Sequence, residues 1–183
     1  MPNIDRRVRR TRTALAHALL ALAGERPFAA LTIRQITDRA DVGYATFFRH
    51  YRSKEALLLD VLGEIVGELA DLLQPTAEEG RHEDAGRDLF AYAAAHAAAL
   101  RVLFDAQRGG ALELELRTAV QERVLASAAF RPPPEVPAEL AAHQLAVGAL
   151  ALVGWWLERG MPYPPARMGR IYARLVARPI LTA

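Results

Sequence analysis

The chain has 183 residues, of which 52% are hydrophobic and 24% charged, a composition typical of a folded protein and not of a disordered one. It contains no Cys, which excludes disulfides and thiolate metal sites and fits a cytoplasmic location. Its net charge of +2 is unevenly divided: residues 1–60 hold 11 Lys and Arg against 6 Asp and Glu, and residues 61–183 hold 12 against 15. Either an anionic partner for the N-terminal part, such as nucleic acid, or a solvated basic face would explain this division.

Helical spacing of apolar residues dominates the chain, and no alternating β-branched run is long enough to predict a sheet. We therefore expect an all-α protein. The first helix is predicted from about residue 10 to residue 23. Its basic start and apolar run resemble a secretion signal, but Leu15, Leu19 and Leu22 have the spacing of an amphipathic face, so we predict a folded helix. The preceding DRRVRRTR is either a frayed basic tail or an arm that touches phosphates or the minor groove.

Three further helices follow in short succession. Thr32 and Gln35 have the spacing of a capping box, which predicts a second helix over residues 32–40. After a short turn, a third helix is predicted from Tyr44 to about Tyr51, and Ser53 is placed to cap a long fourth helix. The polar stretch 74–86 is predicted to be a linker.

The C-terminal part is expected to hold helices near residues 85–106, 110–129, 137–159 and 165–178, separated by Gly- and Pro-rich breaks. The helix over 137–159 contains a run of thirteen residues without a charge. A membrane span needs about 20 such residues, so we expect this helix to be buried on two sides within protein, without membrane contact.

Residues 32–51 have the pattern of a helix-turn-helix packed on the first helix. Ile33, Ile36, Phe47 and Tyr51 are expected to point inward. The third helix then presents a surface with two rings and no acidic side chain, which suits the major groove of DNA. Lys54, in the first turn of the fourth helix, opposes the helix dipole and would be explained by a neighbouring phosphate.

The segment LTIRQITDRADVGYATFFRHYRSKEALLLDVL resembles the DNA-binding domain of TetR-type transcriptional regulators. The resemblance covers about residues 10–60. It implies a helix-turn-helix domain over 1–60, with its motif at about 32–51, and a helical effector-binding and dimerisation domain over 61–183. It also implies a regulator, favoured to be a repressor, that binds a double-stranded DNA operator. Two departures are Asp41 at the usual turn Gly and Phe48 at a usual Tyr.

By the same resemblance, one set of side chains is expected near DNA bases and a second near phosphates. The first set is Arg34, Tyr44, Ala45, Phe48, Arg49 and His50; the second is Thr32, Thr46 and Lys54.

A homodimer on a palindromic operator is expected, because one short recognition helix offers little surface for tight binding. The helices near 137–159 and 165–178 carry more apolar residues than one intrachain contact can cover. Leu140, Val147 and Ala151 form one stripe. The residues expected at the interface are Leu145, Ala149, Leu152, Trp156, Ile171 and Leu175.

The resemblance further suggests a cavity for a small, mainly apolar effector. The side chains available for it are Phe90, Tyr92, His96, Phe104, Gln107, His143, Gln144 and Trp155. A filled core of close-packed Ala-rich helices is the alternative, and His96 would then be an ordinary core histidine.

No arrangement of catalytic residues stands out, because the chain lacks a Gly-rich phosphate loop and a His-Glu-x-x-His motif, and Ser53 is explained as a cap. We expect no enzyme, no cofactor and no metal site, with RHED at 81–84 merely solvated. The rival function is a helical adaptor that binds protein through 137–159 without reading DNA. A steep loss of DNA affinity with salt would separate the two.

Overall fold

The computed structural model describes residues 2–107, 111–128 and 130–181, which are mostly helical and contain no strand. The helical segments in chain order are α1 (Pro2–Glu25), η1 (Phe28–Ala30), α2 (Ile33–Ala40), α3 (Tyr44–His50), α4 (Lys54–Glu78), α5 (His82–Ala95), α6 (Ala97–Gln107), α7 (Ala111–Ala126), α8 (Ala138–Glu158), α9 (Pro165–Tyr172), η2 (Ala173–Ala177) and α10 (Arg178–Ile180). The all-α fold predicted from the sequence is confirmed.

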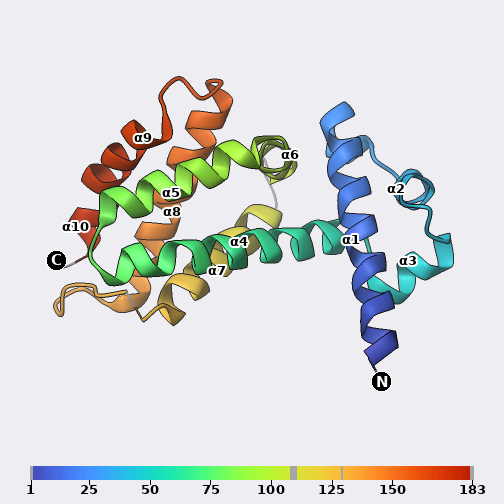
Figure 1. Ribbon diagram of the computed structural model, residues 1–183, viewed down its shortest axis with the longest axis horizontal. Helices are drawn as coiled ribbons and strands as arrows, with labels where there is room; N and C mark the ends of the chain where they lie inside the picture. The colour runs from blue at the N-terminus through green and yellow to red at the C-terminus, as the bar shows by residue number, and fades with distance from the viewer. Residues whose placement is uncertain (1, 108–110, 129, 182–183) are drawn as a thin grey trace.

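The helices gather at two ends of an elongated molecule (Figure 1). α1, α2 and α3 lie together at one end, and α5, α8, α9 and α10 lie at the other. α4 begins against α1 and extends to the far end, with α7 alongside it. One continuous helix, α4, therefore runs from the three N-terminal helices to the far end of the molecule.

Large apolar side chains fill the space between the N-terminal helices. Leu19 of α1, Ile36 of α2, Phe47 of α3 and Leu57 of α4 are fully buried in one cluster. Tyr51, at the end of α3, is also buried. The inward orientation predicted for Ile36, Phe47 and Tyr51 is confirmed, and this packing fixes which side of α3 faces outward.

Backbone contact joins α5 to α9 at the opposite end. A Cβ atom added to Gly169 would lie 2.5 Å from the backbone N of Arg87 and the backbone O of Glu83. A Cβ atom on Gly86 would lie 2.8 Å from the Cα atom of Gly169. The two helices can approach this closely because neither glycine has a side chain.

α8 has one buried side and one exposed side. Ala142, Ala146, Val153 and Trp156 are buried, and the Trp156 indole N–H donates to the Tyr163 carbonyl over 2.9 Å. Within the described part of the chain, α8 is the helix long and apolar enough to cross a membrane, with a mean hydropathy of 1.5 and 39% of its most apolar window buried. It packs on α7, α6 and η2 as a core helix does, but much of its apolar surface is left uncovered.

Two boundary predictions were wrong. The stretch 74–86 is not a linker, because α4 continues past position 75 and only residues 79–81, with Gly80 at φ 67°, separate it from α5. Pro removes one hydrogen bond, which packing against neighbouring helices can outweigh. The single helix expected over 85–106 is two helices that change direction at His96, in an Ala-rich run without a periodic signal. The last helix contains a π-helical segment, η2.

Candidate nucleic-acid interface

The turn between α2 and α3 has the geometry that the sequence predicts. The Thr32 hydroxyl accepts from the Gln35 backbone N–H over 3.3 Å, and the Gln35 side chain accepts from the Thr32 N–H over 3.0 Å, so the capping box is confirmed. Asp41 adopts the left-handed conformation, with φ 53° and ψ 44°. The Val42 N–H then donates to the Thr37 carbonyl over 3.0 Å, which closes the turn before Gly43.

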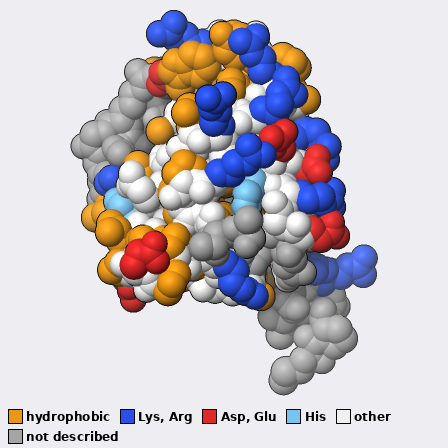
Figure 2. All heavy atoms as spheres, turned by 90° about the vertical axis from the view of Figure 1, so that its left-hand side faces the viewer, with side chains coloured by type: hydrophobic (Ala, Val, Ile, Leu, Met, Phe, Trp, Pro, Cys, Tyr) orange, Lys and Arg blue, Asp and Glu red, His pale blue; other side chains and the backbone are white. Residues whose placement is uncertain are grey.

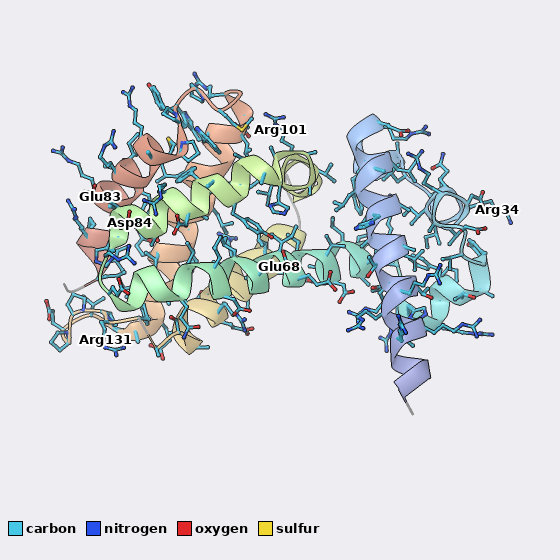
Figure 3. All side chains as sticks on the ribbon, in the orientation of Figure 1. Arg34, Glu68, Glu83, Asp84, Arg101 and Arg131 are labelled. Atoms are coloured by element: carbon cyan, nitrogen blue, oxygen red, sulfur yellow. The ribbon has the colours of Figure 1, made fainter. Side chains whose placement is uncertain are left out.

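The outward side of α3 carries rings that the fold itself does not bury. Tyr44 is 49% exposed and Phe48 is 48% exposed, and their rings meet edge to face at 5.3 Å. The Arg34 guanidinium of α2 lies 5.7 Å from the Tyr44 ring centre and extends from the end of the molecule remote from α8 (Figure 3). Ala45 and Arg49 are exposed on the same helix. Exposed rings beside cations form a surface that can meet base edges and phosphates.

The remaining predicted DNA contacts lie at the edges of this surface. Thr46 and His50 are half-buried, and the His50 ring lies 6.3 Å from that of Tyr51. Thr32 is exposed, but its hydroxyl already serves the capping box. All nine predicted positions therefore fall on or beside α2, α3 and the start of α4.

Lys54 has a role within the chain that the sequence analysis missed. Its ammonium group donates to the carbonyls of Phe28, Ala29 and Leu31 over 2.9, 3.0 and 2.8 Å, and lies 4.8 Å from the Phe28 ring centre. These bonds satisfy the carbonyl end of η1 and use the three ammonium donors. The position of Lys54 is therefore explained without a phosphate, and a phosphate contact by Lys54 stays a prediction. The only sequence feature that pointed to such a role was the position of the chain's single Lys in the first turn of α4.

A polar network that the sequence analysis did not foresee joins α1, α3 and α4. The Tyr51 hydroxyl donates to Asp60 Oδ2 over 2.5 Å, and the Arg12 guanidinium Nε donates to the same carboxylate over 3.1 Å and to the Tyr51 oxygen over 3.2 Å. Burial and the bond to Asp60 raise the pKa of Tyr51 to about 12. Tyr51 directly follows α3, so the network ties the recognition helix to α4. The sequence indicates this network only through Arg12 and Asp60, two charged residues of opposite sign that stand among apolar neighbours.

The N-terminal arginines lie on a regular helix, not on a frayed tail. α1 already begins at Pro2, and Arg6, Arg7, Arg9 and Arg10 are exposed along it. They border a shallow surface recess together with Thr13, Ala14 and His17. Whether this helix start reaches phosphates remains a prediction.

The seven described side chains among the eight predicted to line an effector cavity do not gather around one site. Phe90 is fully buried against Trp156, with ring centres 5.1 Å apart, and the Tyr92 hydroxyl donates to Glu68 over 2.9 Å. His96 is exposed and stacks on Tyr92 at 4.0 Å. The half-buried His143 lies 3.3 Å from the Gln121 side chain, and the half-buried Phe104 packs against Gly154. Gln144 and Trp155 are exposed, and the side chain of Gln107 lies outside the described residues.

A different set of side chains surrounds a cavity of about 170 Å³ between α4, α5, α7, α8 and η2. None of the seven described side chains predicted for the effector site lines it. The predicted polar and aromatic residues were selected by type, whereas this cavity is lined mainly by Val, Leu and Ala, which the sequence presents as ordinary core.

The predicted dimer residues divide into two groups. Leu145 and Trp156 are buried in the chain's own core, so their assignment to an interface was wrong. Leu175 is 63% exposed, and Ala149, Leu152 and Ile171 are half-buried. The alternative stripe of α8 is the more open one, since Leu140 is 56% exposed and Ala151 is exposed. With 3.6 residues per turn the two stripes lie about 150° apart, on nearly opposite sides of the helix. Because both sides are apolar, composition alone does not show which of them the fold buries.

Comparison with known proteins identifies the N-terminal segment. A family model described as bacterial regulatory proteins of the tetR family matches residues 15–61. An uncharacterized HTH-type transcriptional regulator of Bacillus subtilis, YxbF, is 44% identical over 71 residues. This match covers 38% of the present chain and 19% of that protein, so the chain spans only about a fifth of the curated relative's length.

Solved structures share the fold over nearly the whole chain. A protein of Syntrophomonas wolfei assigned to the TetR family superposes with a TM-score of 0.75 at 15% identity, covering 90% of this chain and 91% of that one. NalD of Pseudomonas aeruginosa, the secondary repressor of the MexAB-OprM efflux pump, has a TM-score of 0.67 at 18% identity and 95% and 97% coverage. FadR of Thermus thermophilus, a repressor in complex with lauroyl-CoA, has 0.64 at 19% identity and 94% and 96% coverage.

Proposed function

We propose that the chain, whose residues 15–61 match the family model of bacterial regulatory proteins of the tetR family, is a ligand-responsive repressor that binds a palindromic operator as a homodimer. Residues 1–60 form its DNA-binding domain, and residues 61–183 form the domain for effector binding and dimerisation. The protein acts on DNA in the cytoplasm.

The observation that carries this proposal is the outward surface of α3. Tyr44 and Phe48 are half exposed although both are large rings, and Arg49 beside them is exposed and forms no hydrogen bond or ion pair with the described residues. A seven-residue helix this well anchored on its inner side by Phe47 is suited to enter the major groove. The proposed base contacts are Arg34, Tyr44, Ala45, Phe48, Arg49 and His50, and the proposed phosphate contacts are Thr32, Thr46 and, at the margin, Lys54.

The uncovered side of α8 supports the homodimer. Leu140 and Ala151 lie on this side, and Trp155 near the end of α8 is 41% exposed. Leu175 of η2, the segment that directly follows α9, is a further exposed apolar side chain. Figure 2 shows hydrophobic side chains bordered by Arg on the end of the molecule opposite the DNA-binding helices. An isologous pairing of α8 and α9 with the same helices of a second copy would cover such a surface and set two α3 helices apart.

The direct test is selection of bound sequences from random double-stranded DNA with the full chain. We expect an inverted repeat whose half-sites are centred about one helical turn apart, or a multiple of that distance. Sedimentation at micromolar concentration should give a dimer. A direct repeat, or a monomer that binds one half-site, would contradict the proposal, and affinity without sequence preference would favour a non-specific basic protein.

A further inference from the structure

The cavity between α4 and α7 is lined mostly by apolar side chains. Its volume is about 170 Å³. That volume is close to the roughly 150 Å³ of an engineered apolar cavity that binds benzene. The apolar lining includes Val66, Leu69, Leu73, Val120, Val124 and Leu145. A single ring or a short alkyl chain fits this space, and a long acyl chain would need a larger one.

Two polar groups inside the cavity are neutral. Burial raises the pKa of Tyr172 to about 12, and burial, followed by the nearby Arg178, lowers the pKa of His82. Neither side chain has a hydrogen-bond partner among the described residues, and both line the cavity. The inner part therefore offers no counter-charge and suits the uncharged body of a ligand.

Arg123 places a cation at the edge of the cavity, paired with Asp71. A second recess of about 240 Å³ shares Ala70, Gln74, Arg123 and Ser127 with the cavity, so the two adjoin between α4 and α7. The Arg123 guanidinium Nη2 lies 3.2 Å from Asp71 Oδ1, and the Asp71 side chain is 77% exposed. An ion pair this exposed contributes little to stability. A carboxylate from a ligand could thus replace Asp71 at Arg123 at small cost, with the bidentate geometry that guanidinium favours.

We propose that this site binds a small amphipathic carboxylate about the size of benzoate, with its apolar body in the cavity and its carboxylate on Arg123 in place of Asp71. The inference rests on the proposed ligand-responsive function and specifies its effector. Asp71 belongs to α4 and Arg123 to α7, so binding exchanges a contact between these two helices for a contact with the ligand. α4 also carries Asp60, which holds Tyr51 at the end of α3.

Isothermal titration of the full chain with benzoate, and with benzyl alcohol as its uncharged counterpart, tests the site. Arg123→Gln should weaken benzoate roughly tenfold or more, the loss expected for a hydrogen bond to a charged group, and should leave benzyl alcohol unchanged. Asp71→Asn should strengthen benzoate several-fold, because it removes the competitor for Arg123. Arg170→Gln, an exposed arginine on α9 that contacts only its own helix, is the matched control and should change neither probe.

Equal effects of Arg123→Gln and Arg170→Gln on benzoate would overturn the proposal, as would the absence of binding of either probe to the unmodified chain. A weakening of both probes by Arg123→Gln would also contradict it, because the carboxylate would not be what Arg123 recognises. None of these titrations contains DNA. A failed titration beside a successful operator selection refutes the ligand class alone, and the reverse result refutes the regulator.

Discussion

The two ends of the molecule join their helices by opposite means. Around α3, large side chains such as Phe47 and Leu57 fill the space, and charged groups such as Lys54 tie neighbouring segments together. At the crossing of α5 and α9, Gly86 and Gly169 bring the two backbones into contact, with no room for a side chain. The packing around α3 depends on the volume and charge of particular side chains, whereas the crossing of α5 and α9 depends on the absence of side chains at two glycines. Substitutions should therefore act differently at each.

The largest expected effect is that of Gly169→Ala. Its Cβ atom would lie 2.5 Å from backbone atoms of Arg87 and Glu83, so α9 must shift away from α5. We expect the free energy of unfolding to fall by about 3 kcal/mol, at the upper end of overpacking effects. Gly63→Ala is the control, since no atom lies within 4 Å of that position, and it should be neutral or stabilising by up to about 1 kcal/mol. Urea unfolding measures both, and equal changes would show that the crossing is not backbone-limited.

Lys54→Met should have the next largest effect. The substitution keeps much of the aliphatic chain but leaves the carbonyls of Phe28, Ala29 and Leu31 without their donor. A loss of about 2 kcal/mol is expected for hydrogen bonds to a charged group. Arg49→Met, on the exposed side of α3, should change stability by less than about 0.5 kcal/mol. If thermal unfolding finds the two variants alike, Lys54 does not hold η1 in place.

The same contrast explains which parts of the structure could be predicted from the sequence. The helix-turn-helix was predictable, because the capping pair Thr32 and Gln35 and the apolar spacing through Phe47 are local signals that leave few conformations open. The C-terminal part was not, because its Ala-, Leu- and Gly-rich helices look apolar on several sides. The break at His96, the rotation of α8 that buries Trp156, and the cavity at Arg123 all depend on which neighbour covers which face. Only tertiary packing decides that.

Tyr51→Phe should have a smaller effect. At neutral pH it removes the hydroxyl that bonds Asp60 and Arg12, for a loss of about 1 kcal/mol. The pKa of Tyr51 is raised from 10 to about 12, so the folded chain holds this proton more tightly than the unfolded chain does. The resulting stability is complete below pH 10 and is lost as the pH rises from about 10 to 12.

Unfolding measured across that range should therefore be less pH-dependent for Tyr51→Phe than for the unmodified chain. Some dependence should remain, because burial raises the pKa of Tyr172 similarly. An unchanged pH dependence would mean that the hydroxyl of Tyr51 ionises as freely in the folded state as in the unfolded one.

The central claim is that the outward side of α3 is kept for DNA and contributes little to the fold, and binding of Tyr44→Ala and Arg49→Ala to selected and scrambled DNA tests it most directly. Fluorescence anisotropy at fixed salt should give losses of about 1–3 kcal/mol each on the selected sequence, with much smaller losses on scrambled DNA and unchanged unfolding temperatures. Arg170→Ala, on α9, should match the unmodified chain on both. Equal losses on the two DNAs, or no loss on the selected sequence, would contradict the account.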